Sequence, residues 1–302
     1  MNTYGTVPYP DIDPTPLAGA AYVLMFGMMF GDAGQGLLLV AVAVLLRFGR
    51  PRPLARWGSA WPFVAGAGVA STVFGLLYGE FFGPTGVVPV LWLEPLSEPV
   101  LLLGAGVAVG AVLLAAAYAV AIVNRWREGG PQTALYASSG IAGAALFLGI
   151  ACVAVGLLRS SDLVVVLGGV AAAVGLALAG IGFAAASGGG GAGAAQAAVQ
   201  LFYIVIRTGS NLVSFARLAA FGLVHAALGA LVWQGTTALV MFAGFAGVAA
   251  AIVVFLLGNA LAFSLEALVA AIQALRLEFY ELFSRVFEIE GRPFRPWHLE
   301  AR

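Results

Sequence analysis

The sequence predicts an all-α fold, a polytopic membrane helix bundle with seven to eight transmembrane helices, of which the last two are long and tilted. Apolar residues make up 62% of the 302 residues, charged residues only 9%, and the mean hydropathy is +1.01, far from the values of soluble domains. Apolar runs of about 20 residues or more, the length that crosses hydrocarbon as a helix, follow one another along the chain. Single strands cannot satisfy their backbone groups in lipid, so we expect each run to be helical. The runs are 17–46, 58–82, 99–123, 133–158, 162–186, 195–232 and 238–284.

Polar breaks separate these runs. Proline and arginine interrupt the chain at 47–56, acidic residues and prolines at 83–98, and arginine and proline at 124–131. The segment SGGGGAG lacks the Lys-Ser/Thr of a phosphate-binding loop and predicts a flexible linker. The predicted parts are a short polar N-terminal segment at 1–16, a transmembrane domain at 17–288 with the glycine-rich linker at 187–193 inside it, and a C-terminal tail at 289–302.

Charge placement predicts the orientation. All 14 basic residues are arginine and the formal net charge is zero, so the chain has no basic cluster of the kind that binds nucleic acid. The breaks at 47–56 and 124–131 are basic, whereas the break at 83–98 is acidic. Because positively charged loops stay in the cytoplasm, we expect the C-terminal tail to be cytoplasmic.

The first apolar run contains a carboxylate, Asp32, in the stretch FGMMFGDAGQGLLLV. The run from 17 to 46 would be about 45 Å long as one helix, too long for an upright span. Either it crosses once with a strong tilt, or it breaks near Gly31 and Gly34 into two short helices. In the second case Asp32 would cap the helix that begins after the break.

Two polar seams lie in the last two runs. The first has steps of three and four, which place its members on one helix face, and consists of Arg207, Ser210, Asn211, Ser214 and Arg217. The second has members seven apart with two polar neighbours beside them, and consists of Asn259, Glu266, Gln273, Tyr280, Arg276 and Ser284.

Placing an arginine near the bilayer centre costs between about 3 and more than 10 kcal/mol of free energy. We therefore expect such an arginine to have a compensating contact or a function. A structural explanation pairs Arg217 with Glu266 and lets Arg207 and Arg276 extend to the membrane interface. A functional explanation makes the seams the walls of an ion path.

Five ordered stretches of the chain resemble the membrane subunit of rotary V-type and archaeal-type ATPases, called subunit a or subunit I. They are DIDPTPLAGAAYVLMFGMMFGDAGQG, STVFGLLYGEFFG, SNLVSFARLAAFGLVHAALGALVW, LEALVAAIQALRLEFYELFSRVF and GRPFRPW. The resemblance covers essentially the whole chain. Family members usually carry a large cytosolic N-terminal domain before these stretches, so the resemblance implies that this domain is a separate polypeptide or that the stator is attached differently.

The resemblance implies roles for single residues. Arg217 matches the arginine that is essential for ion transfer, Arg276 matches a second arginine, and Gln273 matches a neighbouring glutamine. Glu266 matches an acidic residue of the ion channel and His225 a histidine beside it, although a neutral, packed imidazole is an equal alternative.

The other matching residues have weaker roles. Asp32, with Gly31 and Gly34, lies in a stretch that belongs to the fold, so we expect it to be structural. Glu80 and Glu278 are weaker candidates for channel mouths, and we expect Glu278 to be solvated.

As the resemblance implies, the chain would form two ion half-channels in a stator and present Arg217 to the carboxylates of a proteolipid c-ring. Further partners would be a peripheral stalk or separate cytosolic stator domain, a central-stalk subunit and membrane lipid, with protons or Na⁺ as the transported ion and no cofactor or metal. The location would be a prokaryotic plasma membrane. A secondary transporter that uses the same buried Arg and Glu residues is the alternative, although the halves of the chain show no repeated motif.

Overall fold

The computed structural model describes residues 11–48, 55–188, 190–242 and 244–284, and over these ranges it contains helices and no strands. The predicted all-α membrane bundle is confirmed. Six helical segments are long and apolar enough to cross a membrane. Of the predicted parts, most of the N-terminal segment, the whole C-terminal tail and the GRPFRPW stretch lie outside the described residues.

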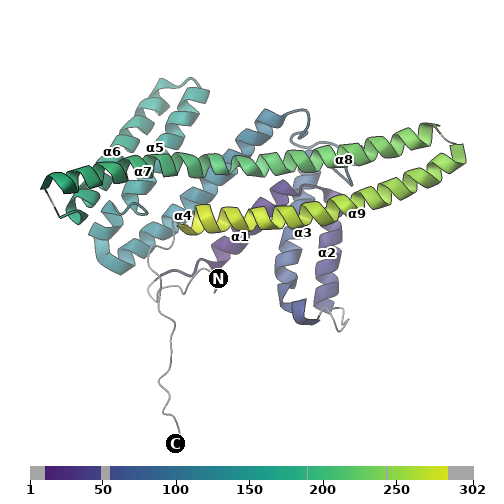
Figure 1. Cartoon of the computed structure of the whole chain (residues 1–302), viewed down its shortest axis with the longest axis horizontal. Coiled ribbons are helices and arrows are strands. Elements are labelled where there is room, and N and C mark those ends of the chain that lie inside the picture. Colours follow the sequence, from purple (N-terminus) through teal and green to yellow (C-terminus); the bar gives the residue numbers. More distant parts are fainter. Residues whose placement is uncertain (1–10, 49–54, 189, 243, 285–302) are drawn as a thin grey trace, which may run out of the picture. The chain divides into compact units, whose positions relative to one another are not determined.

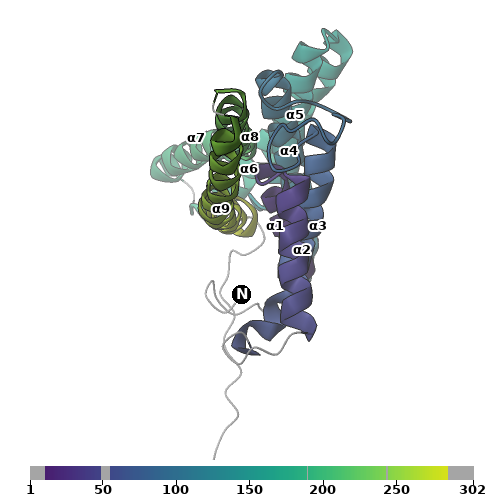
Figure 2. The ribbon, with the colours of Figure 1, turned by 90° about the vertical axis from the view of Figure 1, so that its right-hand side faces the viewer.

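Most helices follow the apolar runs, but the run 195–232 is divided between two helices, and the predicted break at 233–237 lies inside the second of them. They are α1 (Thr15–Met29), α2 (Ala33–Phe48), a short 3₁₀ turn (Ala55–Ala60), α3 (Trp61–Tyr78), α4 (Pro99–Tyr136), α5 (Ile141–Leu158), α6 (Asp162–Ala186), α7 (Gly190–Ser214), α8 (Ala216–Phe242), α9 (Gly244–Leu277) and a π-helical turn (Glu278–Phe283). Figure 1 shows α8 and α9 running side by side in opposite directions, and Figure 2 shows the same pair from the side.

The first apolar run is two short helices. Helices α1 and α2 have 15 and 16 residues, and the chain between them, residues 30–32, is not helical. The break lies next to Gly31 and Gly34, as predicted by the alternative in which the first run is two short helices. Neither helix alone reaches the length of a full hydrocarbon span.

The predicted break at 124–131 is confirmed only at its end. Residues 124–129 are helical, and the helix is interrupted at Gly130, whose φ of 74° is not helical, directly before Pro131. The polar groups there are satisfied locally: Arg125 forms a 2.8 Å salt bridge with Glu128, and Asn124 accepts a hydrogen bond from the backbone of Ile12. After this interruption the chain is helical again up to Tyr136, and the next helix, α5, begins at residue 141.

The predicted glycine-rich linker is also shorter than expected. Helix α7 begins at Gly190, so most of the segment 187–193 belongs to its first turn. The last two runs are long, as predicted: α7 and α8 are interrupted only around Phe215, and α9 has 34 residues. Their tilt in a bilayer stays a prediction.

The chain forms two compact units. The Arg217 unit comprises residues 17–110 and 212–278, and the Arg207 unit comprises residues 1–16, 111–211 and 279–302. Within the Arg217 unit, α2 packs on α3 and α8 packs on α9, and within the Arg207 unit α5 packs on α6.

Helices α2 and α3 approach closely because glycines face each other across the contact. A Cβ atom on Gly68 would lie 2.9 Å from the backbone oxygen of Gly36, which leaves no room for a side chain. Small residues that let helix backbones meet are the usual means of packing helices in lipid. This contact holds α3, and the loop that follows it, against the break between α1 and α2.

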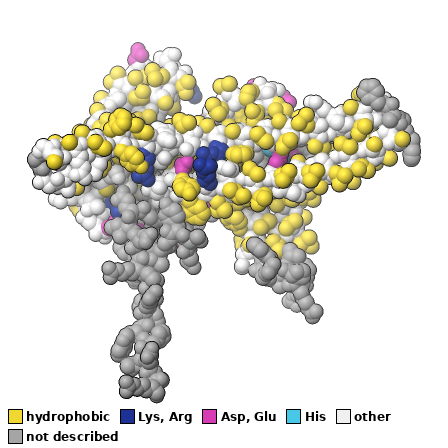
Figure 3. All heavy atoms as spheres, in the orientation of Figure 1, with side chains coloured by type: hydrophobic (Ala, Val, Ile, Leu, Met, Phe, Trp, Pro, Cys, Tyr) yellow, Lys and Arg dark blue, Asp and Glu magenta, His cyan; other side chains and the backbone are white. Residues whose placement is uncertain are grey.

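The outer surface of the long helices is apolar. Figure 3 shows hydrophobic side chains over the visible face of α8 and α9, with few charged groups between them. On α9 the exposed side chains include those of Leu261, Leu265, Leu268 and Ile272. Exposed aliphatic rows of this kind suit contact with lipid or with another membrane helix.

Candidate functional site

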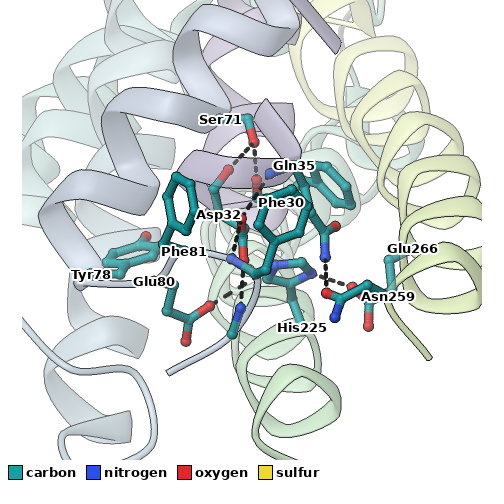
Figure 4. A network of polar contacts seen from close by, with 12 residues as sticks. Phe30, Asp32, Gln35, Ser71, Tyr78, Glu80, Phe81, His225, Asn259 and Glu266 are labelled. Carbon is teal, nitrogen blue, oxygen red and sulfur yellow. Dashed lines mark hydrogen bonds and ion pairs between the residues drawn. The ribbon is translucent and has the colours of Figure 1, made fainter. Parts of the chain in front are cut away.

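A cluster of buried and partly buried polar side chains lies within the Arg217 unit (Figure 4). The cluster joins the α1–α2 break, the loop after α3, and helices α8 and α9. Its members are Asp32, Gln35, Glu80, His225, Asn259 and Glu266. Buried polar groups in a membrane helix bundle are costly and mark functional positions by default.

Asp32 holds the break between α1 and α2 in place. Its side chain is fully buried, and Oδ1 accepts a hydrogen bond of 2.8 Å from the backbone N–H of Gln35. With Asp32 at the N-cap, Gln35 is the third residue of α2, so this is the geometry of a helix N-cap. The carboxylate also accepts hydrogen bonds from the backbone N–H groups of Phe82 (3.0 Å) and Gly83 (2.8 Å). One carboxylate therefore satisfies three backbone donors from two segments.

The loop after α3 wraps around this carboxylate. Helix α3 ends at Gly79, which has the left-handed conformation with φ 74° that favours glycine. The backbone oxygen of Glu80 then accepts a hydrogen bond of 2.9 Å from the N–H of Ala33 at the start of α2. Gly83, with φ 92°, turns the chain so that its N–H points to Asp32. These contacts fix the backbone of the loop at Glu80.

His225 lies between two glutamates. Its Nδ1 forms a hydrogen-bonded contact with Glu266 of α9, and its Nε2 lies 3.9 Å from Oε2 of Glu80. The Glu80 and His225 side chains are 5% and 4% exposed. The sequence left His225 as either a channel residue or a packed imidazole, and the structure places it in contact with a carboxylate on each side, within a row Glu80–His225–Glu266.

The Glu80 end of this row opens to a cavity of about 150 Å³ lined by Glu80, Glu94 and the surrounding loop. Burial raises the pKa of the Glu80 carboxyl to about 7, His225 lowers it, and Asp32 and Glu266 raise it. A carboxyl group that titrates near neutral pH can both accept and donate a proton under ordinary conditions. Glu80 therefore sits where a proton could pass between a water-accessible cavity and His225.

The raised pKa of Glu80 predicts a pH dependence of stability. The pKa of Glu80 is 4.5 in the unfolded chain and about 7 in the folded protein, so the folded protein binds the Glu80 proton more tightly. The contribution of Glu80 to folding stability is therefore full below pH 4.5 and is lost as the pH rises to about 7. The shift corresponds to at most about 3 kcal/mol. In Glu80→Gln we expect the thermal unfolding temperature in detergent to depend less on pH between 4.5 and 7.

The exposed Glu98→Gln variant is the matched control, since it removes a nearby carboxyl group that does not affect the pKa of Glu80. Equal pH dependence in Glu80→Gln and in the unchanged protein would contradict the assignment.

Arg217 lies in the first turn of α8, half-buried, and its Nη1 is buried without a hydrogen-bond partner among the described residues. The antiparallel packing of α8 on α9 shows which residue of α9 lies opposite Arg217. His225 of α8 contacts Glu266 of α9, and Arg217 lies eight residues before His225. Arg217 therefore lies at the height of Ala274, eight residues after Glu266 and next to Gln273. The Oε1 atom of Gln273 is likewise buried and unpartnered. A second antiparallel contact, in which Gly258 faces Val232, gives the same register within one residue.

Of the two explanations offered for Arg217, the structural one does not hold, because the Glu266 carboxylate contacts His225 and not Arg217. One expectation for a charged residue is wrong. Glu278 is not solvated: its side chain is 6% exposed, at the point where α9 passes into the π-helical turn. Arg276, by contrast, is exposed, as expected of an arginine that extends to the surface.

The remaining predicted residues fall into two groups. Ser214 belongs to the Arg217 unit, as does Asn259, whose Oδ1 accepts a 3.4 Å hydrogen bond from the Gln35 side chain. The residues in the Arg207 unit are Arg207, which donates to the backbone oxygen of Ser284 at 3.2 Å, and Ser210, Asn211 and Tyr280. The first seam is therefore divided between the two units.

Sequence reasoning missed Gln35 and Ser71. Ser71 of α3 donates its hydroxyl hydrogen bond to the backbone oxygen of Phe30 in the break. The spacing of Asp32 and Gln35 resembles that of a capping box, in which Glu or Gln stands three residues after the N-cap, and this signal could have marked Gln35. No local pattern marks Ser71, whose partner lies 41 residues away.

Asp32, Glu80 and His225 each offer a ligand atom within 4.8 Å of the others. Such spacing would suit a cation, but the Asp32 carboxylate already accepts three backbone N–H groups and His225 contacts Glu266 through Nδ1.

Comparison with known proteins found extensive similarity, although no protein-family model matches the chain. The chain is 29% identical over its whole length to the A-type ATP synthase subunit I of Aeropyrum pernix and covers 49% of it. It is 28% identical over 97% of its length to the same subunit of Pyrococcus abyssi and covers 44% of that protein. Over 82 residues, 27% of this chain and 18% of the relative, identity reaches 46% with V-type ATP synthase subunit I 2 of Treponema pallidum. The chain thus spans about half the length of the curated relatives that it matches from end to end.

Proposed function

We propose, on the premise that this chain is a member of the subunit a/I family of V-type and A-type ATP synthases, that it is the stator membrane subunit that couples ion translocation to rotation of a proteolipid c-ring. The unpartnered guanidinium of Arg217 carries this proposal. A half-buried cation with a buried Nη1 and no counter-charge among the described residues is costly, and a carboxylate supplied by another subunit would neutralise it.

The proposed mechanism follows from the cost of charge in lipid. A ring carboxylate can move through hydrocarbon only when it is protonated. When it reaches Arg217, the guanidinium lowers its pKa by about 1 to 3 units, so the carboxyl group releases its proton. Arginine suits this role because its own pKa stays above about 12, which prevents it from relaying protons itself.

The row from the Glu80 cavity through His225 to Glu266 is proposed as one half-channel. It contains alternating carboxyl and imidazole groups, which can hand a proton on by acceptance at one atom and donation from another. Glu266 lies eight positions from Ala274, so the row ends about 12 Å along α9 from the level of Arg217. A proton that arrives there is still separated from the arginine, as coupling requires.

The second half-channel is proposed to use the remaining polar residues of both seams, with Arg276 and Gln273 beside Arg217. Its further candidates are Arg207, Ser210, Asn211, Ser214 and Tyr280. Because the two paths are offset along the membrane normal, a proton would cross the membrane only while bound to a carboxyl group of the rotating ring. A proton-motive force would therefore produce torque. Transport of Na⁺ in place of H⁺ would depend on the ring site.

The location and partners belong to the same proposal. We place the protein in a prokaryotic plasma membrane with its C-terminus in the cytoplasm. Its proposed partners, besides the c-ring and lipid, are a peripheral stalk or a separate cytosolic stator domain, and a central-stalk subunit.

Purification in mild detergent tests this assignment. The tagged protein, extracted from its own cells, is expected to co-elute with a small proteolipid that carries a mid-helix carboxylate and with subunits of an ATP synthase. The co-eluting chains are identified by mass spectrometry, with an unrelated tagged membrane protein as control. Absence of any proteolipid from a preparation that retains the protein would favour a secondary transporter.

A further inference from the structure

We propose that the end of the hairpin formed by α2 and α3 binds the headgroup phosphate of an anionic membrane lipid. The site consists of Arg47 in the last turn of α2 and Trp61 at the start of α3. Arg47 stands 15 residues after Asp32, which is about 22 Å along α2, so the site is separate from the buried polar cluster. The proposal does not depend on the stator function.

Charge is the first reason. The sequence between Asp32 and Glu80 contains four arginines and no acidic residue. All four arginines fall within residues 47–56, at the point of the sequence where α2 ends and α3 follows. Among the described residues, Arg47 forms no salt bridge. A cluster of arginines next to a membrane-spanning helix attracts anionic lipid headgroups, and the segment Gly58–Tyr78 is apolar enough to span a membrane.

The geometry of Arg47 is the second reason. The central carbon of its guanidinium group lies 5.3 Å from the centre of the Trp61 ring and 5.5 Å from the centre of the Phe48 ring. Such cation–π contacts hold the planar group against the rings and leave the N–H donors at its edge available. Two of these N–H groups match two oxygens of a phosphate group. Arg47 is exposed, so its donors are accessible to a headgroup at the membrane surface.

The exposed face of α2 is the reason for choosing a lipid as the source of the phosphate. Apolar side chains at steps of four and three form one exposed row along this helix, and the row consists of Leu37, Ala41, Val44 and Phe48. The row ends next to Arg47, so acyl chains can lie along it while the headgroup reaches the guanidinium. Trp61 is 37% exposed at the same end, and tryptophan is enriched at the headgroup level of membranes. A free phosphate ion or a soluble acidic protein would use the charge and leave the row uncovered.

Lipid binding by the purified protein in detergent tests the proposal. The protein is titrated with phosphatidylglycerol and, separately, with phosphatidylcholine that has the same acyl chains, and the bound lipid is counted by native mass spectrometry. We expect phosphatidylglycerol to bind more tightly. Arg47→Gln should weaken the binding of phosphatidylglycerol about fivefold, the effect of one arginine near a membrane surface, and should leave the binding of phosphatidylcholine unchanged.

Arg159→Gln is the matched control, because it removes the same charge from an exposed arginine at the end of α5, where Asp162 follows three residues later. This variant should bind phosphatidylglycerol as tightly as the unchanged protein does. An equal loss of binding in both variants would show that only the overall charge matters and would overturn the site.

The other outcomes are equally decisive. If the unchanged protein binds the two lipids with equal affinity, the lipid site is wrong and an acidic protein becomes the better partner for the arginines. This comparison needs no variant, so it holds even if Arg47→Gln folds poorly. Unchanged binding of phosphatidylglycerol by a folded Arg47→Gln variant would also overturn the proposal. Inorganic phosphate at the same concentration should not displace the lipid, and displacement would show an anion site that needs no acyl chain.

Discussion

Arg217→Ala is expected to abolish ATP-driven acidification of vesicles while leaving the protein inserted and assembled. Without the guanidinium, a ring carboxylate has no charge to favour its ionised form beside the stator, and a pKa difference of 1 to 3 units corresponds to about 1.4 to 4 kcal/mol. Insertion should survive, because Arg217 forms no ion pair within the described residues and its Nη1 is unpartnered. The measurement is acidification by the reconstituted complex, with ring co-purification as the check of assembly.

Arg217→Lys should also fail. A buried ammonium loses its proton readily, so a lysine would be a group that can relay protons between the half-channels, and it lacks the planar fork of arginine. Arg276→Ala should impair pumping more mildly, since Arg276 is exposed. Arg159→Ala, at an exposed arginine just after α5, is the matched control and should pump normally. Retained acidification by Arg217→Ala would contradict the proposed mechanism.

The helical plan could be predicted from the sequence because lipid leaves few alternatives. Apolar runs must be helical, so their positions predict α3 and α6 with small errors at the ends, whereas the run 195–232 combines α7 with part of α8. The errors fall where polar residues are satisfied by side-chain contacts. Arg125 and Glu128 form a salt bridge within helix α4, whereas the sequence analysis predicted a polar break between helices at these residues.

The candidate site could be predicted only in part. His225 and Glu266 were each expected near an ion path, but their contact depends on the register of α8 against α9, which no local spacing gives. The same register places Glu266 about 12 Å from the level of Arg217 along α9. The burial of Glu278 was missed because charged residues near a helix end are usually solvated. Its burial depends on packing by segments distant in sequence, such as α1, which carries Tyr22.

Asp32→Ala is expected to destabilise the Arg217 unit by about 3 to 5 kcal/mol, because it leaves three buried backbone N–H groups without an acceptor. Loss of the cap frees the start of α2, and loss of the contacts to Phe82 and Gly83 releases the loop that carries Glu80. Asp32→Asn separates these effects. Its single amide oxygen can replace Oδ1, which serves Gln35 and Phe82, but it cannot also serve Gly83 at the position of Oδ2.

The asparagine variant should therefore fall between the unchanged protein and the alanine variant in thermal stability in detergent, and it should retain part of the acidification rate. If Asp32 were itself an obligatory proton carrier, asparagine would be as inactive as alanine at a much higher stability. The two readouts together thus separate a carboxylate that builds the half-channel from one that conducts. The three backbone hydrogen bonds to Asp32 favour the first of these.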